Sequence, residues 1–79
     1  MPHVIVKLLP GRSEQQKVQL AQQLVKDVVR IANTDDKSVS VVIEEVNAED
    51  WTEKVYKPDI ARHWDKLYKK PEYEPKEHE

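Results

Sequence analysis

The sequence has no cysteine, no excess charge of one sign and no long hydrophobic run. Without cysteine there is no disulfide and no Cys-bearing metal motif, and the three histidines lie too far apart for ligand spacing. The net charge is −2, and basic and acidic residues are interspersed, so the sequence has no basic patch of the kind that binds nucleic acid. No stretch approaches transmembrane length, and the first residues show no signal peptide. We therefore expect a cytoplasmic protein that binds neither nucleic acid nor membranes and needs no metal.

The chain is also short, with 79 residues. A lone core of this size is marginally stable unless disulfides, a metal or a partner chain add to it. Because disulfides are excluded, self-association is the remaining way to bury more surface. The sequence therefore predicts an oligomer.

Patterns in the first half predict a strand, a helix and a second strand. Val4 to Leu9 are β-branched and aliphatic and end in the Pro10-Gly11 turn signal. Ser13 and Gln16 match a capping box, where a helix begins. Apolar residues then recur at helical steps, at Val18, Ala21, Leu24, Val25, Val28 and Ala32. A second strand over Ser38 to Val46 would run parallel to the first through a right-handed crossover.

The second half predicts one more helix. Pro58 fits its first turn, Trp64 and Tyr68 belong to its buried stripe, and Pro71 ends it. The Pro- and charge-rich residues 71–79 are expected to form a disordered tail behind a single domain over 1–70. A two-stranded sheet covered on one face leaves its other face and its edges open. The expected fold class is therefore α+β, a βαβ subunit plus a C-terminal helix, with sheets joined between subunits.

Pro2 is the most informative residue. An initiator Met1 is normally trimmed when so small a residue follows, and proline then becomes a terminal secondary amine. Such a nitrogen can accept a proton and act as a general base, whereas retention of Met1 leaves it an amide. Strand alternation directs the side chain of His3 to the opposite face, where a surface or interface role is expected.

The order of these features resembles the 4-oxalocrotonate tautomerase family. Pro2 opens a strand, Pro10-Gly11-Arg12-Ser13 leads into a helix, and Ser38-Val39-Ser40-Val41-Val42-Ile43 follows. The similarity covers roughly Pro2 to Trp51, and the extra helix resembles the small dimeric bacterial tautomerases more than the shorter hexameric members. The resemblance implies a cofactor-independent isomerase, a keto–enol tautomerase, that forms a homodimer in preference to a hexamer.

The resemblance also implies roles for three residues. Pro2 would be the general base and then the general acid of the proton transfer. Arg12 stands just before a helix N-terminus, where anions are favoured, and would bind the substrate carboxylate. Trp51 falls where the family places an aromatic that walls the active site and keeps the amine neutral by desolvation. No metal or cofactor takes part in this scheme.

One departure from the family narrows the expected substrate. Members that act on dicarboxylated dienols carry a second arginine in the second strand, where this chain has Ser40. A lost charge-assisted contact costs on the order of 1.5 to 3 kcal/mol. A 2-oxo monocarboxylic acid or its enol, such as phenylpyruvate, is therefore the expected small-molecule substrate. Proline-directed hydration or dehalogenation of unsaturated acids, and a noncatalytic dimer with a decayed site, stay open as alternatives.

Overall fold

The computed structural model describes residues 1–75, and the chain divides into two compact units, Met1–Glu45 and Val46–Glu79. Within residues 1–75 no helix combines the length and the apolar character that a membrane span requires. One domain over residues 1–70 stays a prediction. Residues 76–79 of the predicted tail lie outside the described residues.

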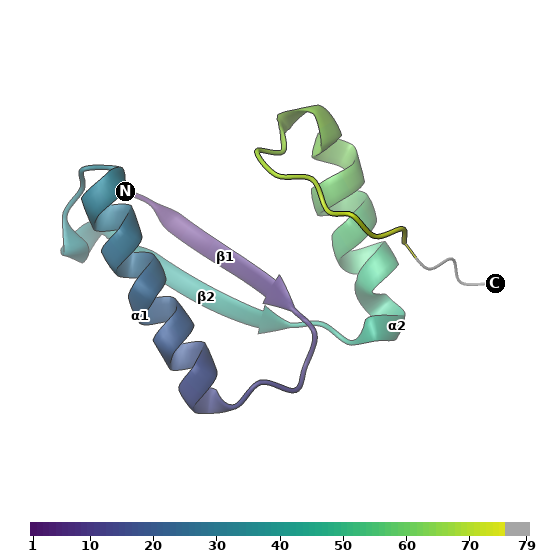
Figure 1. Cartoon of the computed structure of the whole chain (residues 1–79), viewed down its shortest axis with the longest axis horizontal. Coiled ribbons are helices and arrows are strands. Elements are labelled where there is room, and N and C mark those ends of the chain that lie inside the picture. Colours follow the sequence, from purple (N-terminus) through teal and green to yellow (C-terminus); the bar gives the residue numbers. More distant parts are fainter. Residues whose placement is uncertain (76–79) are drawn as a thin grey trace. The chain divides into compact units, whose positions relative to one another are not determined.

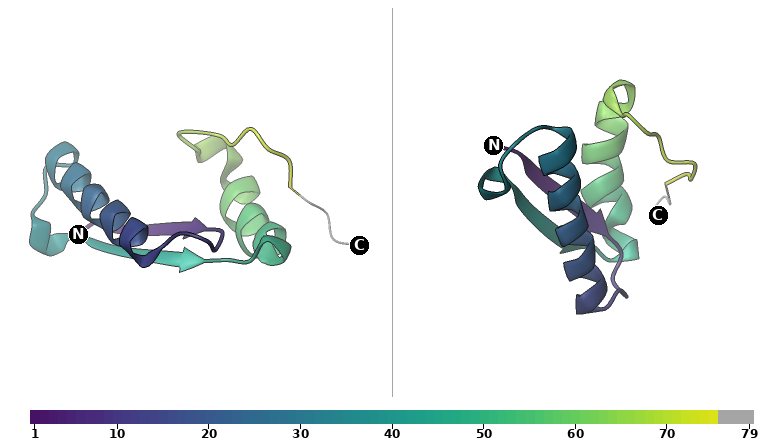
Figure 2. Two further views of the ribbon diagram at one scale, coloured as in Figure 1. Left: turned by 60° about the horizontal axis from the view of Figure 1, so that its bottom comes forward. Right: turned by 60° about the vertical axis from the view of Figure 1, so that its left-hand side comes forward.

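The first unit is a strand, a helix and a second strand (Figure 1). β1 (His3–Leu8) is followed by α1 (Glu14–Ile31), the 3-10 turn η1 (Asp36–Ser38) and β2 (Ser40–Glu45). The two strands pair in parallel, with His3 opposite Ser40 and Leu8 opposite Glu45. α1 lies over one face of this sheet (Figure 2). The predicted βαβ unit with parallel strands and the α+β class are confirmed.

Local hydrogen bonds explain where α1 begins and ends. Ser13 Oγ accepts from the Gln16 N–H at 3.1 Å, and the Ser13 N–H donates to Gln16 Oε1 at 2.8 Å, so the predicted capping box is confirmed. At the other end Asn33 has a φ of 55°, a left-handed conformation that asparagine tolerates. The Thr34 N–H then donates to the Val29 carbonyl at 3.2 Å, which satisfies one of the last helix acceptors.

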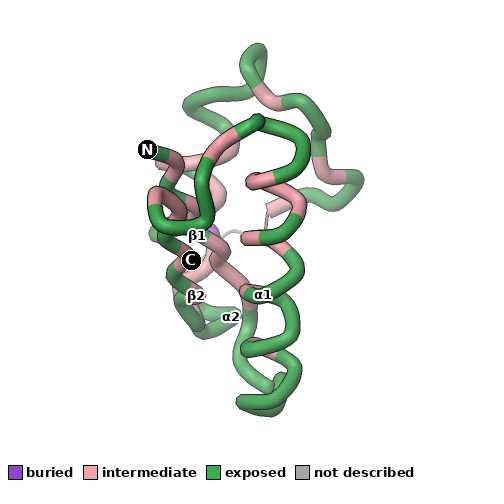
Figure 3. Tube along the Cα trace, turned by 90° about the vertical axis from the view of Figure 1, so that its left-hand side faces the viewer, coloured by how far each residue is buried: buried purple, intermediate pink, exposed green. Residues whose placement is uncertain are grey.

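The two faces of the sheet differ in burial. Exposed and half-buried residues alternate over most of each strand, with Val4, Val6, Val41 and Ile43 half-buried, and the alternation stops at the last residues, where Lys7 and Leu8 are both half-buried. On the open face Ile5 and Val42 lie opposite each other and are 54% and 38% exposed. Among residues 1–75 only Thr52 and Val55 are buried, and buried positions are correspondingly scarce along the trace (Figure 3). The first unit alone therefore has no closed core.

The predicted apolar stripe of α1 is only partly covered. Ala21, Leu24, Val25 and Val28 are half-buried, whereas Ala32 is exposed and Val18 is 44% exposed. The unit has one helix on two strands, so nothing else within it covers the ends of the stripe.

The second unit is built on one run of helical turns. α2 (Ala48–Trp51) continues into η2 (Thr52–Ile60), a wide helix with hydrogen bonds from i to i+5, and then into the 3-10 helix η3 (Ala61–Lys66). Pro58 lies inside η2, so the prediction that it begins a separate helix is wrong. Pro58 has no N–H to donate within this helix, and at the end of η2 the Ala61 N–H is shared by the carbonyls of Lys57 and Tyr56.

The predicted buried stripe of the last helix is wrong for both Trp64 and Tyr68, and the helix ends at Lys66 and not at Pro71. Tyr68 lies beyond the end of η3 and is fully exposed, and Trp64 is 38% exposed. The buried residues among 1–75 are instead Thr52, which directly follows Trp51, and Val55, about one turn further along the helix. The second unit therefore packs around the beginning of its helix.

Candidate functional site

Pro2 stands directly before β1 and is held through its own carbonyl. The Ser40 N–H on the neighbouring strand donates to the Pro2 carbonyl at 3.2 Å. Pro2 is half-buried, whereas Met1 is fully exposed. Because the hydrogen bond that holds Pro2 comes from its carbonyl side, the nitrogen can become a terminal amine without losing that bond.

A side-chain hydrogen bond also joins the two strands at this end of the sheet. His3 Nδ1 and Ser40 Oγ share a hydrogen bond of 2.6 Å, and the two residues lie opposite each other in the register. His3 is exposed, as strand alternation predicted. Ser40 therefore contacts both Pro2 and His3. Sequence patterns missed this pair because the register of the two strands had to be known first.

Arg12 lies in the turn that precedes α1, one residue before the helix cap Ser13. Its Nη1 donates to the Leu9 carbonyl at 3.1 Å, which holds the guanidinium over the turn. The residue is exposed, and a guanidinium has further N–H donors for a ligand. The neighbouring helix N-terminus also favours an anion. This turn is therefore suited to bind a carboxylate.

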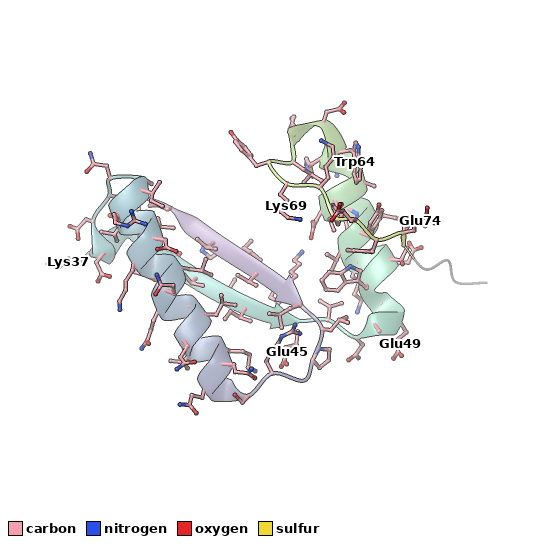
Figure 4. All side chains as sticks on the ribbon, viewed as in Figure 1. Lys37, Glu45, Glu49, Trp64, Lys69 and Glu74 are labelled. Carbon is pink, nitrogen blue, oxygen red and sulfur yellow. The ribbon has the colours of Figure 1, made fainter. Side chains whose placement is uncertain are left out.

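Lys17, the next cation along the chain, is paired with two carboxylates. Its Nζ lies 3.2 Å from Glu45 Oε1, at the end of β2, and 3.3 Å from Glu14 Oε2 (Figure 4 labels Glu45). The hydrogen bond to Glu45, followed by that to Glu14, raises the pKa of Lys17 above its ordinary value of 10.5. Because its charge is already balanced, Lys17 competes little with Arg12 for a substrate anion.

Pro2 and Arg12 of one chain lie at opposite ends of β1. Pro2 precedes the strand and Arg12 follows it, and Figure 1 shows the N-terminus at one end of β1 and the connection to α1 at the other end. The six residues of β1, at about 3.3 Å each, make the strand about 20 Å long. A small 2-oxo acid is much shorter than this strand. Within a single chain the structure therefore does not bring the predicted base and the predicted carboxylate ligand together.

Trp51 is the last residue of α2 and belongs to the second unit. Its indole N–H donates to the Tyr73 hydroxyl at 2.8 Å. The Tyr73 ring lies edge-on to Tyr56, with ring centroids 5.7 Å apart and an angle of 63° between the planes. No local pattern predicts these contacts, since Tyr73 falls in a segment whose composition is typical of a tail. Trp51, Tyr56 and Tyr73 form an aromatic cluster within this unit.

Metal ligands are not gathered in the part of the chain that the structure describes. Within residues 1–75 no three His, Asp or Glu side chains come close enough to hold a metal ion.

Comparison with known proteins identifies the family. The family model described as "Tautomerase enzyme" matches residues 2–54. A "Probable tautomerase" of Xylella fastidiosa (strain 9a5c) is 41% identical over 73 residues, which cover 92% of this chain and 89% of that protein. "Tautomerase PptA" of Enterobacter sp. (strain 638) is 39% identical over 74 residues, with coverage of 92% and 97%.

A solved structure supports the same conclusion. TomN, a 4-oxalocrotonate tautomerase homologue in the tomaymycin biosynthetic pathway, is 34% identical, with a TM-score of 0.61 over 63% of this chain and 77% of that chain. The fold is thus the parallel βαβ unit of small tautomerases. The chain belongs to the tautomerase family and is an isomerase.

Proposed function

We propose that the chain is a cofactor-independent keto–enol tautomerase for a 2-oxo monocarboxylic acid such as phenylpyruvate, in its enol form. The observation that carries the proposal is Pro2, which stands before β1 in a tautomerase-family chain and is held there by its carbonyl. Removal of Met1 is part of the proposal, because only then is the Pro2 nitrogen a base.

The proposed reaction moves one proton through Pro2. The neutral amine takes the proton from the enol hydroxyl, and the electron pair of that O–H bond forms the carbonyl at C2. The C2–C3 double bond then takes the proton back from the pyrrolidinium at C3. Atoms and charge balance, and the amine is regenerated. Hence no metal or redox cofactor takes part.

Arg12 is the proposed ligand of the substrate carboxylate. Its hydrogen bond to the Leu9 carbonyl holds the guanidinium over the turn, so less side-chain freedom is lost when the anion binds. A planar guanidinium can bind a carboxylate through two parallel hydrogen bonds. Trp51 is the proposed apolar wall that keeps water from the amine.

A homodimer follows from the position of these residues. Each strand of the two-stranded sheet is an edge, and open edges are usually paired or covered. If two copies join along β1 about a two-fold axis, the strands run antiparallel, and the amino end of one lies beside the carboxyl end of the other. Pro2 of one copy and Arg12 of its partner then share one site.

The position of Ser40 favours a monocarboxylate. Relatives specific for dicarboxylates are expected to carry an arginine there, whereas the Ser40 hydroxyl is occupied by His3. A second substrate carboxylate would therefore lack its cationic ligand. We therefore expect the site to favour phenylpyruvate-like acids over dicarboxylated dienols.

Kinetics of two variants test the proposal. Phenylenolpyruvate ketonisation is followed by ultraviolet absorbance on Met1-free protein, with the oligomer checked by native mass spectrometry. We expect Pro2→Ala to lose the enzymatic rate and Arg12→Gln to lower kcat/KM about ten- to a hundredfold, the worth of a charge-assisted hydrogen bond. Arg62→Gln removes the same charge from an exposed position of η3 and serves as the control. An unchanged rate for Pro2→Ala would refute the proline mechanism.

A further inference from the structure

We propose that Tyr73 is a positioning residue, whose hydroxyl fixes the indole of Trp51 and thereby sets the affinity of the site for its enol substrate. The inference rests on the proposed role of Trp51 in that site. It adds a residue from the C-terminal segment to the determinants of substrate binding.

The central observation is a hydrogen bond between side chains far apart in sequence. The Trp51 indole N–H donates to the Tyr73 hydroxyl at 2.8 Å across 22 residues. An indole has only this one donor, so the bond fixes the direction of the ring edge. Trp51 is half-buried, which leaves part of its ring available to a ligand.

Tyr73 is itself held by its neighbours. Its ring packs edge-on against Tyr56, an arrangement that favours aromatic pairs beyond simple burial. Pro71 and Pro75 flank it, and both are half-buried. Proline restricts the backbone, so less conformational entropy is lost when the segment holds Tyr73 against the helix.

The wide turns of η2 place Tyr56 beside this contact. Trp51 and Tyr56 are five residues apart, and five residues make a little more than one turn when hydrogen bonds run from i to i+5. In an ordinary α-helix the same spacing would direct the two rings to different sides. Wide helical turns occur frequently at functional sites, which agrees with a role for this cluster.

The position of the bond determines which kinetic constant it affects. Tyr73 does not belong to the proton-transfer step, which the proposed function assigns to Pro2. Freeing the indole should therefore weaken substrate binding and leave the chemical step intact. Because the bond is already present in the free protein, the worth of one neutral hydrogen bond sets the upper limit of the effect, a rise in KM of about tenfold.

The test compares Tyr73→Phe with a matched control. This substitution removes only the hydroxyl and keeps the ring that packs on Tyr56. Tyr68→Phe makes the same change at a fully exposed tyrosine of the same unit. The indole ¹⁵N–¹H resonance of Trp51, assigned with Trp51→Phe, reports the hydrogen bond, and the resonance of Trp64 serves as the internal reference.

We expect Tyr73→Phe to shift the Trp51 resonance, leave that of Trp64 in place and raise KM for phenylenolpyruvate with kcat within about twofold. In a Trp51→Phe background the same substitution should no longer change KM, because the two residues act through one contact. Tyr68→Phe should change nothing. An unmoved Trp51 resonance, or a moved resonance with unchanged KM, would overturn the inference.

The same experiment distinguishes failure of the tautomerase proposal from failure of the inference about Tyr73. A wild-type protein without ketonisation activity refutes the tautomerase proposal for this substrate, and with it the effect of Tyr73 on KM. The indole resonance is independent of turnover and still decides whether Tyr73 holds Trp51.

Discussion

Mixing two impaired variants, Pro2→Ala and Arg12→Gln, should raise the activity above that of either variant alone if the catalytic site joins two copies of the chain. Pro2 and Arg12 lie at opposite ends of β1, a strand about 20 Å long, so we expect that one chain does not offer both to one small acid. In an antiparallel dimer each site takes Pro2 from one copy and Arg12 from the other. Pro2→Ala and Arg12→Gln homodimers then have two damaged sites each, whereas a mixed dimer has one intact site and one doubly damaged site.

The expected rate follows from statistics. Equal amounts of the two variants, unfolded together and refolded, give about half mixed dimers if pairing is random. One of the two sites in each mixed dimer is intact, so the mixture should reach about a quarter of the wild-type rate. The separate variants should each stay well below this value.

The assay is ketonisation of phenylenolpyruvate before and after joint refolding, with dimer composition measured by native mass spectrometry. Joint refolding of Pro2→Ala with a Pro2→Ala, Arg12→Gln double variant is the control, since no pairing of these chains contains an intact site. If mixed dimers form and the rate stays at the level of the separate variants, the shared site is wrong.

Three further outcomes follow from the same structure. Ser13→Ala removes the α1 cap and should lower the free energy of unfolding by about 1 kcal/mol in urea titrations. The pKa of Lys17 is raised in the folded state, so its pairing with Glu45 stabilises the protein below pH 10.5 and this stabilisation is lost as pH rises through the folded pKa. Urea titrations should therefore show a stability difference between wild type and Lys17→Met that shrinks above pH 10.5, and a constant difference would contradict this. Ser40→Arg should increase kcat/KM for a dicarboxylated dienol about tenfold or more, and no gain would remove the argument from Ser40.

Local sequence signals were sufficient to predict the first unit. The capping pair Ser13 and Gln16 is a contact between near neighbours, and strand alternation depends only on local geometry. Both features appear in the structure as expected. The same signals misread Pro58, because a proline is a common first residue of a helix and nothing local indicates the wide turns that accept it in mid-helix.

Contacts across the chain could not be predicted in this way. The His3–Ser40 hydrogen bond depends on the strand register, and the Trp51–Tyr73 bond joins residues 22 positions apart. Roles for Pro2, Arg12 and Trp51 came from resemblance, which names residues without saying which copy supplies each. The length of β1 is our reason for assigning Pro2 and Arg12 of one proposed site to two different copies of the chain.

The most direct test of the account compares two forms of one chain. Mass spectrometry separates preparations that have lost Met1 from preparations that retain it, and each is assayed for phenylenolpyruvate ketonisation. The account predicts a rate well above buffer for the Met1-free form and none for the form that keeps Met1, because an amide nitrogen cannot act as the base. Equal acceleration by both forms would contradict a mechanism that depends on the Pro2 amine.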